Sequence, residues 1–245
     1  MNRLQSELQR LYLPRSPAHA EADTQPSPLI DPQGMVRAMV MELARPASWE
    51  LLSRVWQGVQ AELELPAPAI AVSGVDGLQL WFSLEEPVAA SQAQAFLESL
   101  RVRFLPDVDA RRVRLMPASD TSALRPERHA RLVPALQEQT GNWSAFVAAD
   151  LAPIFADTPW LDIAPNEEGQ ATLLRGLNMI KPAVLEEALK RLAPSVDAPA
   201  APPRPVPVAA ADADPKRFLV RVMNDDTVAL ALRIEAAKAL LQRSG

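Results

Sequence analysis

Residues 69–88 read AIAVSGVDGLQLWFSLEEPV and contain two short apolar runs separated by a four-residue turn. The runs, 69–73 and 78–84, are rich in the residue types that strands prefer. Gly74 and Gly77 flank the turn and suit backbone angles with positive φ, which hairpin turns require. This stretch therefore predicts a β-hairpin.

The sequence on both sides of this hairpin predicts a repeated strand-and-helix order. A strand is expected at 37–43 and a helix with one apolar face at 49–63, before the hairpin. After it come a helix at 91–104, with Ser91 and Gln94 as a capping box, and an alternating strand at 112–116. The order β-α-β-β-α-β predicts an α+β fold with a ferredoxin-like core and both helices on one face of the sheet.

The rest of the chain predicts further helices and a tether. Helices are expected near 126–138, 167–179 and 182–192, and the aromatic segment 143–160 is expected to dock on the sheet. The domain boundaries follow from these features and from proline content. They are an N-terminal helix and proline-containing loop at 1–33, a main α+β domain at 34–193, a Pro/Ala-rich linker at 194–215 and a helical hairpin tail at 216–245.

Composition excludes several classes of site. The chain has no cysteine and two histidines far apart, His19 and His129, so neither disulfides nor a Cys- or His-rich metal site is expected. No cofactor is predicted. No apolar run approaches the ~20 residues that span a bilayer, and the N-terminus lacks a secretory signal, so a cytoplasmic location without membrane contact is expected.

The segment Ser73–Val88 resembles the Ser-Gly-x-Gly-x-His-x-Trp hairpin of archaeo-eukaryotic-type primase–polymerases, in particular those of mobile elements. The resemblance covers about residues 35–117 and includes the strand and helix upstream of the hairpin. It implies a domain that handles nucleic acid and nucleotides. In that family two aspartates at i and i+2 end the first strand, and the histidine lies beside the metal-bound nucleotide.

This chain departs from the family at those positions. Glu42 and Ala44 stand where the two aspartates would be, and Gln79 stands in place of the histidine. One carboxylate alone is a poor magnesium site, and an amide carries no charge. We therefore expect no catalytic, cofactor or metal residue, and interpret Glu42 as a vestigial site position or as a strand-end acid paired with Arg45.

The resemblance, with a local excess of arginine, predicts where nucleic acid would bind. Eight arginines and four acids lie between Arg101 and Arg131. They are either solvated charges or phosphate contacts. On adjacent strand positions, Trp81 and Phe82 point to opposite faces, one in the core and the other available as a platform. The candidate nucleic-acid-binding residues are Ser73, Gly74, Asp76, Gln79, Trp81, Arg101, Arg103, Arg111, Arg112 and Arg114.

The alternative function is a non-enzymatic adaptor that contacts protein only. The tail reads FLVRVMNDDTVALALRIEAAKALLQ and is similar to a C-terminal helical motif in some phage terminase small subunits. Its apolar positions include Phe218, Val222, Leu230, Ile234 and Leu241. Two helices of this size do not fold alone, so the tail is expected to bind a protein partner or to self-associate.

Limited proteolysis tests this domain organisation. Seven prolines and seven alanines among the 22 residues of 194–215 cannot build a core, and the extended linker would reach about 70 Å. We expect rapid cleavage between Ala198 and Ala213 that releases a small fragment and a compact core. A linker that resists protease would show instead that the tail is an integral part of the domain.

Overall fold

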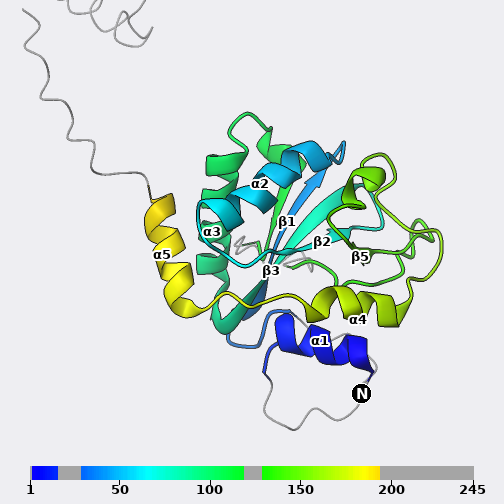
Figure 1. Cartoon of the computed structure of the whole chain (residues 1–245), viewed down its shortest axis with the longest axis horizontal. Coiled ribbons are helices and arrows are strands. Elements are labelled where there is room, and N and C mark those ends of the chain that lie inside the picture. The colour runs from blue at the N-terminus through cyan, green and yellow to red at the C-terminus, as the bar shows by residue number, and fades with distance from the viewer. Residues whose placement is uncertain (1, 16–28, 119–128, 194–245) are drawn as a thin grey trace, which may run out of the picture. The chain divides into compact units, whose positions relative to one another are not determined.

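The computed structural model describes residues 2–15, 29–118 and 129–193 (Figure 1). The expected linker at 194–215 and helical tail at 216–245 lie outside the described residues. Within the described part the fold is α+β, as expected, with a five-stranded antiparallel sheet in the order β4-β1-β3-β2-β5. The strands are β1 (Met35–Ala44), β2 (Ala69–Val72), β3 (Gly77–Ala89), β4 (Val113–Met116) and β5 (Ala145–Val147).

The four strands predicted from the sequence are confirmed, and the short edge strand β5 was not anticipated. Five α-helices surround the sheet in the described part of the chain. They are α1 (Arg3–Leu11), α2 (Trp49–Ala61), α3 (Ala90–Phe104), α4 (Glu167–Arg175) and α5 (Pro182–Leu192). Short 3-10 turns lie at Ala110–Arg112 and Ala152–Phe155.

Helices α2 and α3 cover the same face of the sheet, which confirms the expected arrangement. Met39, Met41 and Leu43 of β1 point to this face, where they form one core with apolar residues of both helices. Because side chains alternate along a strand, Ala38 and Val40 point to the opposite face. There they pack in a second, smaller core with Leu4, Leu8 and Leu11 of α1.

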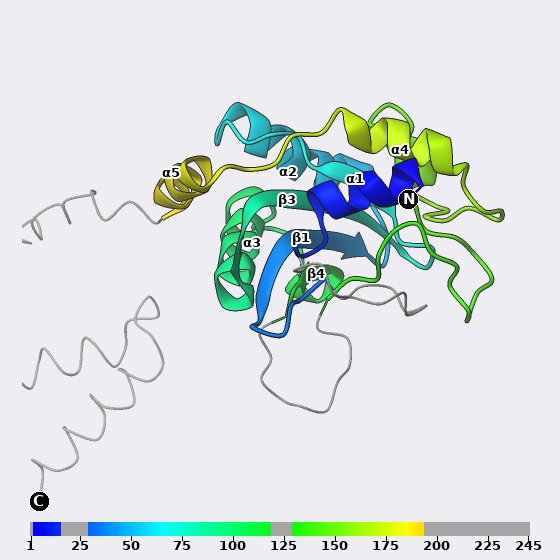
Figure 2. The same ribbon diagram turned by 90° about the horizontal axis from the view of Figure 1, so that it is seen from below.

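The second face is covered only in part. Helices α1 and α4 lie side by side across one portion of it, as the two ribbon views show (Figures 1 and 2). Trp81 of β3 is buried beneath them, with its ring 5.2 Å from Tyr12 and 5.9 Å from Phe146, centroid to centroid. Phe82 is buried in the first core. Both aromatic residues are therefore interior, and the expectation that one of them forms a surface platform is wrong.

Two local predictions are also wrong. Helix α3 begins at Ala90 with Ala89 as its N-cap and no side-chain cap bond, so Ser91 and Gln94 do not form the expected capping box. The long strand β3 runs directly into this helix and leaves no room for a separate cap. The helix expected near 126–138 is absent from residues 129–138, and residues 126–128 lie outside the described residues. Pro134 interrupts this stretch. The backbone then enters a turn, in which the N–H of Gln137 donates to the carbonyl oxygen of Asn142 at 2.8 Å.

Arg37 fastens α1 to the sheet from within. Its side chain is almost fully buried and donates hydrogen bonds to the carbonyl oxygens of Arg10 at 2.8 Å, Leu13 at 2.9 Å and Gln9 at 3.3 Å. It also donates to the carbonyl of Leu84 in β3 at 3.2 Å. The carbonyls at the end of α1 carry the negative end of the helix dipole, so they stabilise the buried guanidinium without a carboxylate.

Replacing this guanidinium should destabilise the domain strongly. In Arg37→Met the buried carbonyls lose their donors, and we expect the free energy of unfolding to fall by about 3 kcal/mol or more. Arg37→Lys should restore only part of the lost stability, because one ammonium group cannot reach all the carbonyl oxygens that the planar guanidinium bonds. Urea denaturation measures both. The matched control Arg54→Met, on the solvent side of α2, should cost at most about 1 kcal/mol. Equal losses in Arg37→Met and the control would contradict this role.

Candidate functional site

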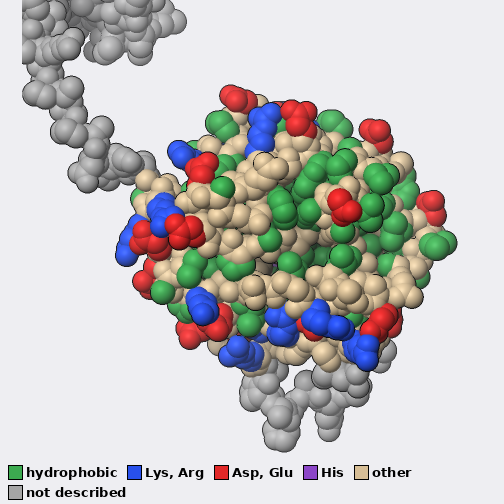
Figure 3. All heavy atoms as spheres, in the orientation of Figure 1, with side chains coloured by type: hydrophobic (Ala, Val, Ile, Leu, Met, Phe, Trp, Pro, Cys, Tyr) green, Lys and Arg blue, Asp and Glu red, His purple; other side chains and the backbone are tan. Residues whose placement is uncertain are grey.

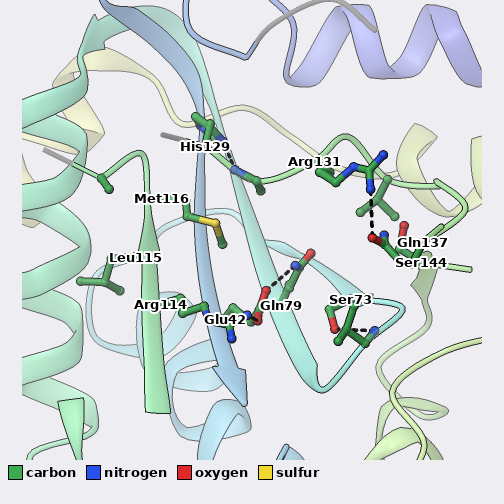
Figure 4. Close-up of a pocket in the computed structure, with 14 residues that line it drawn as sticks. Glu42, Ser73, Gln79, Arg114, Leu115, Met116, His129, Arg131, Gln137 and Ser144 are labelled. Atoms are coloured by element: carbon green, nitrogen blue, oxygen red, sulfur yellow. Dashed lines mark hydrogen bonds and ion pairs between the residues drawn. The ribbon is translucent and has the colours of Figure 1, made fainter. Parts of the chain in front are cut away.

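A cavity of about 540 Å³ opens on the second face of the sheet, beyond the area that α1 and α4 cover (Figure 4). Strands β1, β3 and β4 form one side of it, and the β2–β3 turn and the segment 129–144 form the other. Polar and charged side chains line much of it. They are Glu42, Ser73, Gln79, Arg114, His129, Arg131, Gln137 and Ser144. Apolar side chains, among them Met116 and Val133, complete the lining.

Glu42 and Gln79 lie opposite each other on neighbouring strands. The register of β1 on β3 pairs these two residues directly. Gln79 Nε2 donates to Glu42 Oε2 at 2.7 Å, and Trp81 Nε1 donates to Gln79 Oε1 at 2.8 Å. Because an indole N–H can only donate, it fixes which end of the Gln79 amide faces Glu42. The chain of hydrogen bonds from Trp81 to Glu42 therefore orients the carboxylate within the cavity.

Arg114 of β4 holds the other carboxylate oxygen. Its Nη1 donates to Glu42 Oε1 at 2.7 Å and lies 3.7 Å from Asp76 Oδ1 in the β2–β3 turn. Arg45 pairs with Asp76 Oδ2 at 2.8 Å. The expected pair of Glu42 with Arg45 is therefore wrong. Arg45 follows the last residue of β1 and reaches the turn, while Arg114 lies directly across from Glu42 in the strand register.

The β2–β3 turn is built around Ser73. Its Oγ accepts hydrogen bonds from the backbone N–H groups of residues 75, 76 and 77, at 2.9 to 3.2 Å. Gly74 has φ +81°, as expected for a turn glycine, but Gly77 does not need a positive φ. Gly77 is required for space instead, because a Cβ there would lie 2.8 Å from Glu42 Cγ.

The segment 129–144 supplies cavity residues that sequence reasoning missed. Arg131 donates to the side-chain oxygen of Gln137 at 3.3 Å, and Ser144 Oγ bonds the backbone of Ala135. His129 donates from Nε2 to Ala38 O at 3.0 Å, and its Nδ1 accepts from Ala130 N–H at 2.8 Å. The sequence pattern indicated a helix here, and only the high arginine content that extends to Arg131 pointed to this stretch.

Of the arginines proposed from the sequence, the structure brings only Arg114 into the cavity. Arg101 and Arg103 on α3 pair with Glu98 and Glu62. Arg112 donates to the carbonyl of Pro46 at 2.8 Å, and Arg111 lies in the 3-10 turn before β4. These four residues do not line the cavity. Of the remaining candidates, Ser73 and Gln79 line the cavity, Gly74 and Asp76 adjoin it, and Trp81 lies buried beneath α1.

Burial changes the titration of two cavity residues. It raises the pKa of Glu42 above its ordinary range, and the hydrogen bond from Gln79 and the charge of Arg114 oppose this shift. It lowers the pKa of His129 to about 4, so that this imidazole is neutral near pH 7. With both ring nitrogens engaged, His129 serves as a structural link between the segment 129–144 and β1.

The arrangement is suited to binding polar ligands. Each Glu42 oxygen already accepts a hydrogen bond, and within residues 2–15, 29–118 and 129–193 no three His, Cys, Asp or Glu side chains gather as a metal site. Arg114 and Arg131 both reach the cavity, and Arg114 is 44% exposed in its side chain. Guanidinium groups beside serine and glutamine side chains offer hydrogen-bond donors to an anionic or polar ligand.

No family model matches this chain, and no curated protein matches it.

The helices of the described residues include none that is both long and apolar enough to cross a membrane.

His129 should make the stability of the domain depend on pH. Its pKa is lower in the folded state than in the unfolded chain, so stability is full above about pH 6.5 and falls as the pH drops toward 4. We expect His129 to account for a loss of up to about 3 kcal/mol in the free energy of unfolding over that range. Urea denaturation at several pH values should show a shallower loss for His129→Gln, and parallel curves would contradict the assignment.

Proposed function

We propose that this chain binds nucleic acid through a degenerate primase–polymerase-like domain and does not transfer nucleotides. We further propose that it serves a mobile element or a replication system in the cytoplasm. The observation that carries the proposal is the meeting of Glu42, Gln79 and Ser73 in one polar cavity. These residues occupy the positions that the sequence resemblance assigns to the working site of that family, and Gln79 lies 2.7 Å from Glu42.

The strand order supports a ferredoxin-like core for this domain. The strands β1, β2, β3 and β4 lie in the order β4-β1-β3-β2, all pairs are antiparallel, and α2 and α3 cover one face. A β-α-β-β-α-β chain produces this order when each helix returns over the same side of the sheet. The short strand β5 extends that sheet at the β2 edge.

The chemistry of the cavity favours binding over catalysis. Metal-assisted phosphoryl transfer needs carboxylates that are free to hold a divalent ion. Here Gln79 and Arg114 bond the two oxygens of Glu42, and the neighbouring strand position on the same face is Ala44. The guanidinium of Arg114 lies where it neutralises the buried carboxylate.

The size of the cavity favours a single strand as the ligand. A volume of about 540 Å³ falls in the range that holds a small organic molecule, such as one nucleotide unit. Arg114 and Arg131 would contact phosphate, and the hydroxyl and amide groups of Ser144 and Gln137 would contact sugar or base. A duplex offers no isolated nucleotide to a pocket of this kind without base flipping.

Binding to single-stranded DNA should be weak and strongly dependent on salt. Because an arginine that binds phosphate releases a counterion, removing one such arginine should lower the slope of log affinity against log salt by about 0.7. We expect this reduction, with weaker binding, in Arg114→Gln and in Arg131→Gln. Fluorescence anisotropy with labelled oligothymidylate measures it. The control Arg103→Gln removes an exposed arginine that lies outside the cavity and should behave like the wild type.

Two results would contradict the proposal. Absence of binding at low salt would leave the adaptor function as the better account. Template-dependent incorporation of a labelled nucleotide that disappears in Glu42→Gln would show an active enzyme.

The adaptor function has one observation of its own in its favour. Figure 3 shows hydrophobic side chains gathered on the part of the surface where Figure 1 places β5 and the segment after it. Ile154 is 68% exposed and Ile163 is 77% exposed in that segment. Exposed apolar residues that gather on one face are typical of protein contact surfaces.

A further inference from the structure

The charges that face Glu42 nearly cancel. From β4 comes Arg114, from the β2–β3 turn comes Asp76, and beyond Asp76 lies Arg45 at the end of β1. From β3 comes the neutral amide of Gln79, and burial keeps the nearby His129 neutral near pH 7. With Glu42 ionised, these two acids and two arginines carry no net charge, and Arg131 of the segment 129–144 adds one positive charge to the cavity.

The ionised carboxylate of Glu42 works against an anionic ligand. A phosphate that enters the cavity toward Arg114 also approaches the carboxylate of Glu42, because Arg114 Nη1 lies 2.7 Å from Glu42 Oε1. Glu42 is 5% exposed in its side chain, so solvent screens little of the repulsion. If Arg114 turns its Nη1 from Glu42 Oε1 to the phosphate, an unpaired buried carboxylate remains.

A proton on Glu42 removes this conflict. If a proton from solvent binds Glu42 Oε1 as Arg114 Nη1 leaves that oxygen, the buried group becomes a neutral carboxylic acid. Its O–H can then donate a hydrogen bond to a phosphate oxygen, and Oε2 keeps its bond from Gln79. The burial that already disfavours the ionised form of Glu42 acts in the same direction.

We propose that Glu42 binds a phosphodiester oxygen of single-stranded nucleic acid as a neutral carboxylic acid, taking up one proton as the ligand binds, while Arg114 turns from Glu42 to the phosphate. This inference rests on the proposed function of the same cavity and adds the chemical form in which Glu42 recognises the ligand. One proton is transferred from solvent to Glu42 Oε1, and no covalent bond of the ligand changes.

Proton uptake can be measured directly in the full-length protein. Oligothymidylate is a suitable probe, because its backbone and bases keep their charge between about pH 5.5 and 8. Isothermal titration in two buffers with different heats of ionisation gives the number of protons taken up per ligand bound. We expect uptake near neutral pH in the wild type, and an affinity that rises as the pH falls by at most about tenfold per pH unit.

Glu42→Gln is the decisive variant. Glutamine has nearly the same shape, remains neutral and can still accept from Gln79, so the fold should persist, as its urea denaturation will show. We expect this variant to take up no proton and to bind oligothymidylate at about pH 8 at least as tightly as the wild type does. Glu98→Gln, which removes an exposed acid outside the cavity, should leave the uptake unchanged.

The outcomes separate this inference from the proposed function. Binding by the wild type without proton uptake, or equal uptake in Glu42→Gln, would overturn the role of Glu42 and leave nucleic-acid binding intact. A failure of the wild type to bind oligothymidylate at low salt at any pH would overturn the proposed function, and the inference with it.

Discussion

The pairing of β1 with β3 is the constraint on which the rest of the structure depends. This register places Met41 opposite Leu80 and Glu42 opposite Gln79. Because side chains alternate along both strands, one set of pairs builds the core beneath α2 and α3, and the other set faces the second side of the sheet. A slip of one residue would exchange these sets and bury Glu42 beneath the two helices.

The polar cavity exists because α1 and α4 cover only part of the second face of the sheet. Helices α1 and α4 pack over Trp81, and the segment 129–144 bounds the area beyond them. The polar groups that remain there are bonded to one another, from Trp81 through Gln79 and Glu42 to Arg114. A buried polar network of this kind is stable only when its members satisfy one another, so each group restricts the orientation of the next.

Alternation and spacing were enough to predict four of the five strands, the two core helices and the face they share. The resemblance to the primase–polymerase hairpin brought Glu42, Gln79 and Ser73 under consideration together, because they stand at positions that the family uses in its site. The sequence could not show that Arg114, rather than Arg45, bonds Glu42, since that choice depends on the register of β4 on β1. It also could not show that His129, Arg131 and Ser144 reach the cavity. The pattern of their segment indicated a helix, whereas contacts with distant residues, such as His129 with Ala38 and Thr140 with Gly74, hold the segment in place.

The buried guanidinium of Arg37 defines where this domain begins. The first strand of the sheet starts at Met35, yet carbonyls of Gln9, Arg10 and Leu13 accept hydrogen bonds from the Arg37 guanidinium. A chain that began at Met35 would keep every strand but would lose the three carbonyl oxygens before β1 that bond the Arg37 guanidinium. The smallest unit that folds on its own must therefore include α1. The N-terminal boundary of the domain is set by the hydrogen bonds of a buried charge and not by the first strand of the sheet.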